Sequence, residues 1–306
     1  MTMEPEDLTF QLLQEITDDF SEERRIGAGS YGDVYKGVTK NGEDVAVKML
    51  KEILQLDDQQ FANEFRNLKM LKHQNIVQIL GYCYETNKTP TKYNGKTVLA
   101  EKTYRALCFE YLHNGSLEKH LSDEFHGFDW HTRYKIIKGT CEGLKHIHEE
   151  LAEPLYHLDL KPENILLDKN MVPKIADFGL SRIFGKELAR TTRSLVGTLA
   201  TTKDCSGYPP PEHVERGEIS KRFDIYSLDV MMIKILTGPE GYSNCAYMQN
   251  DGFIDLVQKN WRNRSQATWS GSSLEAYCHQ VKICAQMALN CVEEDRKKHQ
   301  QGAAVP

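Results

Sequence analysis

The sequence lacks several features that would assign it to other classes of protein. Its apolar runs are all shorter than the roughly 20 residues that cross a bilayer, and its acidic N-terminus has no apolar core of a signal peptide. It contains no internal repeat and no low-complexity segment. The formal net charge of −6 at pH 7 argues against a general nucleic-acid binder. We therefore expect a soluble, cytoplasmic chain that has no membrane span and no nucleic-acid partner.

Cysteine pairs with the spacing of metal ligands are also absent. The eight cysteines are scattered, and no two of them form a C-x-x-C pair. Several lie in apolar runs, which favours small buried thiols in a reducing compartment over a disulfide framework or a zinc site. With 306 residues, of which 40% are hydrophobic and 27% are charged, the chain is long enough to bury a full core and to divide into two lobes.

The most informative stretch is YHLDLKPENILLD, at 156–168. It places a carboxylate, an amine and an amide in fixed order, at Asp159, Lys161 and Asn164, before an apolar run that predicts a buried strand. This trio suits phosphoryl transfer, because a carboxylate can accept the proton of an attacking hydroxyl and an amine can neutralise the transferred group. The amide oxygen can ligate a metal ion, and Asp177, which follows a strand-like run, offers a second metal ligand.

A glycine-rich segment, IGAGSYGDV, occupies 26–34. Its G-x-G-x-x-G pattern is weak evidence by itself, because a Rossmann turn has the same pattern and opens a helix. Here an alternating, strand-like run follows at 34–38, and Asn41–Gly42 predicts a hairpin turn into a further strand at 45–48. The pattern therefore favours a hairpin over phosphates, since glycines let backbone N–H groups approach phosphate oxygens closely.

Taken together, these segments resemble the glycine-rich loop, the catalytic loop and the D-F-G segment of protein kinases. The stretches LTFQLLQEITDDFSEERRIG and EYLHNGSLEKHL resemble plant receptor-like kinases. The resemblance covers Leu8 to His299, and it implies an α+β, two-lobed protein kinase fold. The parts it implies are a lead-in at 1–20, a kinase domain at 21–299, and a tail at 300–306. Within that domain a small antiparallel sheet lobe with one helix spans about 21–112, and a larger, mainly helical lobe spans about 113–299.

The resemblance also implies the residues of the site. Lys48 would hold the α- and β-phosphates of ATP and pair with Glu64 on the following helix. The residues expected to act in catalysis are Asp159, Lys161, Asn164, Asp177, Lys48 and Glu64, of which Asn164 and Asp177 would ligate Mg²⁺. The residues expected to bind the nucleotide are Ile26, Gly27, Ala28, Gly29, Ser30, Tyr31, Gly32, Asp33, Val34, Ala46, Lys48, Phe109, Glu110, Leu112 and Leu166.

The implied reaction is transfer of the γ-phosphoryl group of Mg–ATP to protein hydroxyls in plant receptor-like signalling. Lys161 favours serine and threonine substrates, because tyrosine kinases of the family usually lack this lysine. The sequence leaves open an association with membranes through a receptor partner. Two alternatives also stay open. One is a pseudokinase or decoy that binds without turnover, and the other is a nucleotide binder that uses only the glycine-rich loop.

Departures from the family pattern favour the pseudokinase alternative. Leu158 replaces the arginine that normally binds a phosphate on the activation segment, so we expect weak control by phosphorylation there. An insertion at 199–206 changes the peptide-binding region, and Asp229 places a charge in a helix that should be central. His299 stands where the arginine that pairs with Glu212 is expected. The chain then ends in QGAAVP, so we expect the last helix of the fold to be absent.

The sequence also predicts two features of the first lobe. Apolar residues at helical spacing predict a short amphipathic helix at 10–16 that docks on this lobe. The polar, turn-rich stretch at 85–103 predicts a surface hairpin loop.

In the second lobe, an apolar stripe predicts a long helix at 130–151. The two histidines near its end, His146 and His148, are expected at the surface or in packing positions. Asp224, in the stretch FDIYSLD, is expected to hold the backbone of the catalytic loop.

Overall fold

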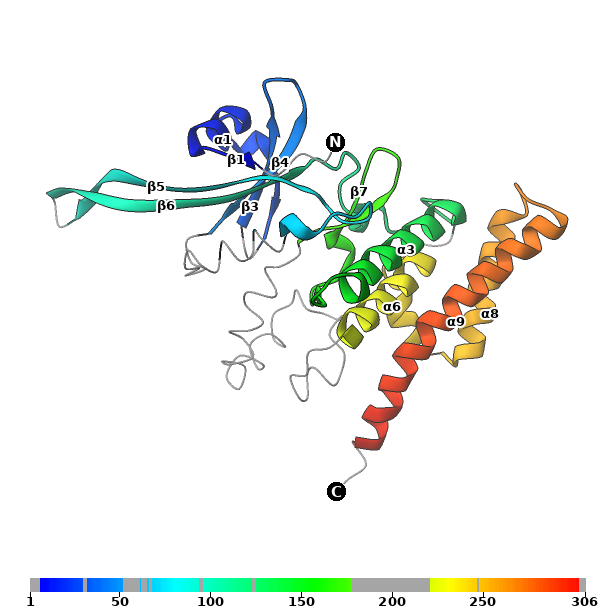
Figure 1. The fold of residues 1–306 in the computed structure, drawn as a ribbon. Coiled ribbons are helices and arrows are strands. Elements are labelled where there is room, and N and C mark those ends of the chain that lie inside the picture. The colour runs from blue at the N-terminus through cyan, green and yellow to red at the C-terminus, as the bar shows by residue number, and fades with distance from the viewer. Residues whose placement is uncertain are drawn as a thin grey trace. The chain divides into compact units, whose positions relative to one another are not determined.

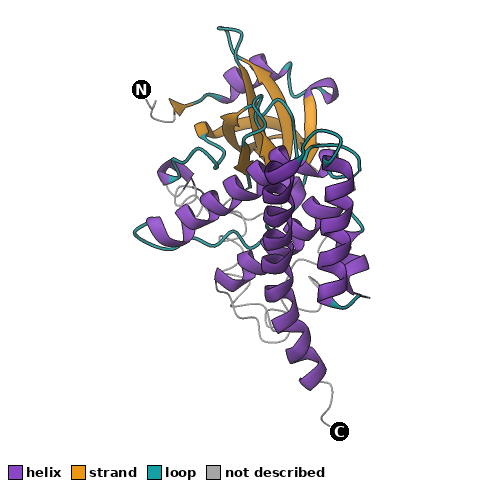
Figure 2. Ribbon diagram, turned by 90° about the vertical axis from the view of Figure 1, so that its right-hand side faces the viewer, coloured by secondary structure: helices purple, strands orange, loops and turns teal. Residues whose placement is uncertain are grey.

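The fold consists of a sheet-rich part and a mainly helical part (Figures 1 and 2). The computed structural model describes residues 6–29, 32–51, 61, 65, 68–93, 96–122, 125–177, 221–246 and 248–302. These residues divide into two compact units, Met1–His113 and Asn114–Pro306. This α+β architecture confirms the predicted fold class.

The first unit is built on a six-stranded sheet with the order β1-β5-β6-β4-β3-β2. All neighbouring strands are antiparallel except β1, which runs parallel to β5. The hairpin between β3 and β4 turns at Gly42, whose φ of 79° suits glycine, as the Asn41–Gly42 pair predicted. The strands are β1 Glu6–Asp7, β2 Arg25–Ala28, β3 Gly32–Val38, β4 Asp44–Leu50, β5 Ile79–Tyr93 and β6 Lys96–Glu110.

A short helix, α1 (Phe10–Thr17), docks on this sheet near the N-terminus (Figure 1). It begins at Thr9, whose hydroxyl accepts a hydrogen bond from the backbone N–H of Leu12 at 3.2 Å, a common N-cap arrangement. Leu13 and Ile16 are buried in one apolar cluster with residues of β4, β5 and β6. The helix packs so closely that a side chain on Gly37 would meet Ile16 at 3.2 Å. The expected docking of this segment is therefore observed.

The stretch at 85–103 differs from its predicted structure. Instead of a hairpin loop, it belongs to two strands that stay paired as far as Tyr93 and Lys96. Pairs of side chains directly across the two strands stabilise this structure. The threonine hydroxyls of Thr86 and Thr103 are 3.0 Å apart, and the guanidinium of Arg105 lies 5.3 Å from the ring of Tyr84. Such contacts join residues distant in sequence, so composition alone did not reveal them.

The second unit is mainly helical (Figure 2). The predicted helix at 130–151 is confirmed as α3 (Trp130–Lys145), which continues into a turn of π-helix, η4 (His146–Glu150). Helix α9 packs against both α6 and α8. None of the helices in the described ranges has both the length and the apolar character needed to cross a bilayer. The other elements are η3 Leu117–His120, η5 Pro162–Asn164, β7 Ile165–Leu167, β8 Pro173–Ile175, α6 Lys221–Thr237, α7 Gly241–Ala246, α8 Asn250–Ser265 and α9 Gly271–Gly302.

Arg133 organises the core of the second unit. Although it is only 4% exposed, its guanidinium donates hydrogen bonds to the carbonyl oxygens of Ile235 at 2.7 Å, Ser122 at 2.9 Å and Phe128 at 2.9 Å. It also lies 4.9 Å from the ring of Trp261, within range of a cation–π interaction. A planar group with five donors is suited to this role, and it ties α3 to the ends of α6 and α8.

The cysteines of the described ranges are free thiols, and most of them are buried. Burial raises the pKa of the thiols of Cys83 and Cys108 to about 12, with nearby carboxylates adding to the effect at Cys83. These thiols are therefore protonated and unreactive at neutral pH. The predicted role of cysteine as a small buried side chain is confirmed for this part of the chain.

The docking of α1 makes a prediction about stability. Leu13 is 1% exposed, and its replacement by alanine should lower the free energy of unfolding of the first unit by about 3 kcal/mol, because it leaves a cavity between α1 and the sheet. Hydrogen exchange at the amides of Val45 and Val47 measures this loss. The matched control is Leu99→Ala at a leucine that is 69% exposed, which should change the free energy by less than about 0.5 kcal/mol. Equal exchange rates in both variants would show that α1 does not stabilise the sheet.

Candidate functional site

Three of the predicted catalytic residues meet in one loop of the second unit. The ammonium of Lys161 lies 3.2 Å from Oδ2 of Asp159. The amide nitrogen of Asn164 donates to the backbone oxygen of Asp159 at 2.7 Å and to its Oδ2 at 3.1 Å. Asn164 is buried, whereas the side chain of Asp159 is 39% exposed. The loop therefore fixes the carboxylate of Asp159 and still leaves it accessible to a substrate hydroxyl.

The sequence between these residues explains the shape of the loop. Pro162 occupies the first turn of η5, a position that suits its fixed φ and its missing N–H group. The apolar run that follows forms the predicted strand β7, and β7 pairs with β8 in the register Ile165↔Ile175. Both of these isoleucines are fully buried. The small sheet anchors the loop at its C-terminal end.

The backbone of Ala176 connects this loop to Asp177. Its N–H donates to the backbone oxygen of Asn164 at 2.8 Å, and its carbonyl oxygen accepts a hydrogen bond from Nε2 of His157 at 2.8 Å. Asp177 comes next in the chain, with an exposed side chain and a φ of 60°. The backbone hydrogen bond between Ala176 and Asn164 therefore brings the two predicted metal ligands, Asn164 and Asp177, near each other.

The hydrogen bonds of His157 determine its tautomer. The carbonyl oxygen of Ala176 can only accept, so Nε2 carries the hydrogen. The N–H of Asp159 can only donate, and it lies 3.2 Å from Nδ1, so Nδ1 accepts. His157 is therefore a neutral imidazole with its hydrogen on Nε2, and it links the residue before Asp177 to the backbone of Asp159.

Asp224, from the first turn of α6, holds the start of the loop. Its carboxylate is fully buried and accepts the N–H groups of His157 and Leu158, each at 2.7 Å. It also accepts Nε2 of His148 at 2.8 Å. Leu158 has a φ of 63°, a strained conformation for a leucine, which these bonds stabilise. The predicted role of Asp224 is confirmed.

The prediction for His148 was incomplete. We expected a surface or packing position, but the side chain is 6% exposed and it is bonded to Asp224. Helical spacing contained the signal, since Leu144 lies four residues earlier and is buried, and residues at this spacing share a face. His146 differs, because its Nδ1 lies 3.0 Å from the partly exposed carboxylate of Glu150.

In the first unit, three residues predicted to bind phosphates lie on strands, namely Gly27 on β2, Gly32 on β3 and Lys48 on β4, and Gly29 follows β2. Lys48 is 4% exposed and sits in β4 between Val34 of β3 and Leu107 of β6. A side chain on Gly32 would collide with the backbone oxygen of Met49, so only glycine fits at this position. Ala46 is paired with Phe109.

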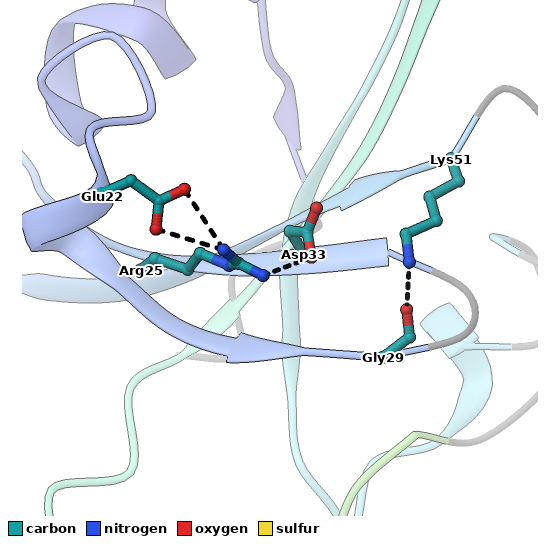
Figure 3. A network of polar contacts seen from close by, with 5 residues as sticks. All are labelled: Glu22, Arg25, Gly29, Asp33 and Lys51. Carbon is teal, nitrogen blue, oxygen red and sulfur yellow. Dashed lines mark hydrogen bonds and ion pairs between the residues drawn. The ribbon is translucent and has the colours of Figure 1, made fainter.

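Polar contacts hold the residues on both sides of the glycine-rich loop (Figure 3). The ammonium of Lys51 donates to the backbone oxygen of Gly29 at 2.7 Å. Arg25 pairs with Glu22 at 3.1 Å and with Asp33 at 3.5 Å. The hydrogen bond that Arg25 donates to the carboxylate of Glu22 is the main cause that raises the pKa of the Arg25 guanidinium, followed by the charges of Glu22 and Asp33. Asp33, predicted to bind nucleotide, thus has its side chain directed toward Arg25.

The remaining predicted nucleotide-binding residues lie on both units. Glu110 ends β6, and its carboxylate accepts the N–H of Gln78 at 2.9 Å. Leu112 is 6% exposed, and Leu166 of β7 forms a bridge with Ser116. Other predicted positions lie outside the described residues, namely Ser30, Tyr31, Glu64, the insertion at 199–206, Glu212 and the side chain of His299.

Comparison with known proteins shows the family of the chain. Residues 20–299 match the protein kinase domain, and the chain belongs to the protein kinase family. It is 35% identical over 305 residues to cysteine-rich receptor-like protein kinase 7 of Arabidopsis thaliana. The matched region covers 97% of this chain and 42% of the relative. It is 34% identical to the G-type lectin S-receptor-like serine/threonine-protein kinase SRK of the same plant, with 94% of this chain and 33% of the relative covered. The chain thus spans less than half the length of these relatives.

Solved structures of similar fold include two pseudokinases. The pseudokinase domain of BIR2, an immune regulator of the RLK/Pelle family, is 25% identical with a TM-score of 0.61, covering 92% of this chain and 78% of that domain. A second, ligand-free pseudokinase is 21% identical with a TM-score of 0.58, covering 97% and 90% of the two chains. The similarity to the second pseudokinase shows the fold alone. In sequence, the chain is similar to plant receptor-like kinases.

The site makes a prediction about the buried carboxylate. Replacing Asp224 with asparagine puts an NH₂ group in place of one carboxylate oxygen. Because each oxygen accepts a backbone N–H, one buried N–H loses its acceptor, and the free energy of unfolding of the second unit should fall by about 3 kcal/mol. His148→Ala removes one of the three donors and should cost a large part of this amount. Thermal unfolding measures both effects.

The control is His146→Ala, two residues away in the same π-helical turn, which should cost less than about 1 kcal/mol because its partner is partly exposed. If His148→Ala and His146→Ala melt at the same temperature, the bond between His148 and Asp224 does not stabilise the loop.

Proposed function

We propose that this chain is a serine/threonine protein kinase that transfers the γ-phosphoryl group of Mg–ATP to protein hydroxyls. One observation carries the proposal. The carboxylate of Asp159 is held by Asn164, lies beside the ammonium of Lys161 and is accessible to a hydroxyl. Phosphoryl transfer depends on positioning and charge stabilisation more than on covalent chemistry, and this arrangement supplies both.

Each of these groups has a defined task. Asp159 accepts the proton of the substrate hydroxyl, and Lys161 stabilises the negative charge of the transferred group. In the first unit, Lys48 binds the α- and β-phosphates together with the glycine-rich loop, and it pairs with Glu64. ATP supplies the phosphoryl group itself.

The proposed magnesium ligands are Asn164 and Asp177. Because the amide nitrogen of Asn164 donates to Asp159, its amide oxygen can be directed at a metal ion as a ligand, and Asp177 offers carboxylate oxygens. Oxygen donors are those that Mg²⁺ prefers, and it usually keeps phosphate and water ligands as well. The residues described include no cluster of three histidine, cysteine or acidic side chains that could hold a metal by themselves.

A pseudokinase or decoy is the second candidate function. Two observations favour it. Asp229, an acidic residue, is buried in α6. The pseudokinase domain of BIR2 also shares the fold. The intact contacts among Asp159, Lys161 and Asn164 favour the active enzyme.

The proposal extends to the organisation and setting of the chain. We infer a kinase domain at 21–299 with lobes at about 21–112 and 113–299, a lead-in at 1–20 that docks on the first lobe, and a tail at 300–306. The similarity to plant receptor-like kinases supports a cytoplasmic role in receptor signalling, with protein substrates and a receptor partner that brings the chain to a membrane.

The catalytic proposal makes a direct prediction. With radiolabelled ATP, magnesium and a generic serine/threonine peptide, Asp159→Ala should lower the rate of phosphate incorporation at least about 100-fold, because the general base is lost. The control is Glu163→Ala at an exposed acid of the same loop, which should keep the wild-type rate within a few-fold. A wild-type chain with no incorporation above background would favour the pseudokinase, and an unaffected Asp159→Ala variant would remove Asp159 from the mechanism.

The metal ligands make a separate prediction about binding. Asp177→Asn removes the charge of one ligand, so calorimetry should show about tenfold weaker binding of ATP in the presence of Mg²⁺. Binding without a metal should stay the same. Asp255→Asn, at an exposed position of α8, serves as the control. Equal magnesium-dependent affinity in all three proteins would contradict the assignment of Asp177.

A further inference from the structure

The outer part of the β5–β6 hairpin is a two-stranded ribbon. The register of β1 on β5 ends at Tyr82, and the register of β4 on β6 ends at Ala106. Beyond these residues β5 and β6 pair with each other, as far as Tyr93 and Lys96. Figure 1 shows this part of the hairpin reaching away from the other strands of the sheet. We call residues 86–93 and 96–103 the basic ribbon.

Helix α1 contacts the hairpin at residues next to the basic ribbon. The ring of Phe10 stacks on Tyr104 with the ring centroids 3.7 Å apart, and the N–H of Phe10 donates to the carboxylate of Glu85 at 2.8 Å. Glu85 directly precedes the first strand of the basic ribbon, and Tyr104 directly follows its second strand. A hairpin of two strands is marginally stable alone in water, and the described apolar cluster around α1 includes no residue of the basic ribbon. A ribbon of this kind points to a binding role.

The charge of the basic ribbon is opposite to that of the whole chain. It carries four lysines and one carboxylate, which gives a formal charge of +3, whereas the chain has a net charge of −6. The carboxylate, Glu101, lies 3.9 Å from the ammonium of Lys88, and both side chains are 68% exposed. An ion pair in water is weak, so it does not cancel the positive field of the ribbon. The lysines are Lys88, Lys92, Lys96 and Lys102.

Two aliphatic side chains are exposed among these charges. Val98 is 40% exposed and Leu99 is 69% exposed. They are neighbours in β6, so they lie on opposite faces of the ribbon. A flat membrane surface could cover only one of them. A strand placed alongside the ribbon could contact both, because its own side chains also alternate between the two faces.

We propose that the basic ribbon binds an acidic peptide in extended conformation, which adds as a strand alongside β6. The stretch 97–103 of β6 contains no proline, whereas Pro90 in β5 cannot donate a hydrogen bond to an added strand. The added strand would continue the position of β4 in the sheet, and acidic side chains would meet the lysines. Strand addition of this kind draws its affinity from backbone hydrogen bonds and its specificity from alternate side chains. Two copies of the ribbon would repel each other, and the exposed aliphatic side chains and acidic chain disfavour nucleic acid.

The test uses the full chain and a labelled peptide of eight alternating glutamate and valine residues. Fluorescence anisotropy measures binding to the wild type and to the variant Lys88→Gln/Lys92→Gln/Lys102→Gln. The matched control is Lys138→Gln/Lys145→Gln/Lys221→Gln, which removes the same charge from lysines that are 63%, 64% and 60% exposed. A second variant, Leu99→Ser, removes one apolar contact and leaves the charge unchanged. Thermal melting checks that the variants are folded.

The ribbon variant should bind the peptide at least about tenfold more weakly than the control, and Leu99→Ser should bind it severalfold more weakly than the wild type. Bound peptide should also slow hydrogen exchange at backbone amides of 97–103. Equal binding by the ribbon variant and the control would overturn the proposal. So would equal affinity for an alternating lysine and valine peptide, or binding of single-stranded RNA or phosphatidylserine vesicles in preference to the acidic peptide.

Discussion

The candidate site depends on one buried carboxylate. Removing a charged carboxylate from water costs several kcal/mol unless hydrogen bonds replace its hydration, and Asp224 receives two backbone N–H groups and one imidazole. These bonds hold the backbone of His157 and Leu158 in a shape that a free chain would rarely adopt. Asp159 follows directly, so the position of the proposed catalytic base results from the requirement to satisfy Asp224.

The same constraint extends to the proposed metal ligands. His157 links the loop to Ala176, and Ala176 in turn is bonded to Asn164, so Asp159, Asn164 and Asp177 belong to one hydrogen-bonded network. Leu158 takes part through its backbone N–H, not through its side chain. A leucine in place of the usual arginine therefore removes the side chain that would bind a phosphate on the activation segment, and it leaves the backbone of the loop unchanged. The catalytic loop can therefore keep its structure without a phosphate on the activation segment, which is compatible with an active kinase that phosphorylation there affects little.

The sequence predicted the parts of this network that are local. Asp159, Lys161 and Asn164 lie within six residues, so one loop brings them together, and the apolar run after them predicted β7. His148 was missed because its partner lies 76 residues away, and helical spacing shows a buried face without showing what it contacts. The basic ribbon was predicted as a loop, since cross-strand pairs such as Thr86 with Thr103 stabilise it and sequence order hides them.

Hydrogen exchange at the backbone amides of His157 and Leu158 tests the central claim most directly. If Asp224 holds this loop as part of the core, both amides should exchange as slowly as those in the middle of α6, for example that of Val230, because all of them require unfolding of the second unit. If the two amides exchange at the rate of exposed loops while α6 stays protected, the buried carboxylate does not fix the catalytic loop, and the account of the site is wrong.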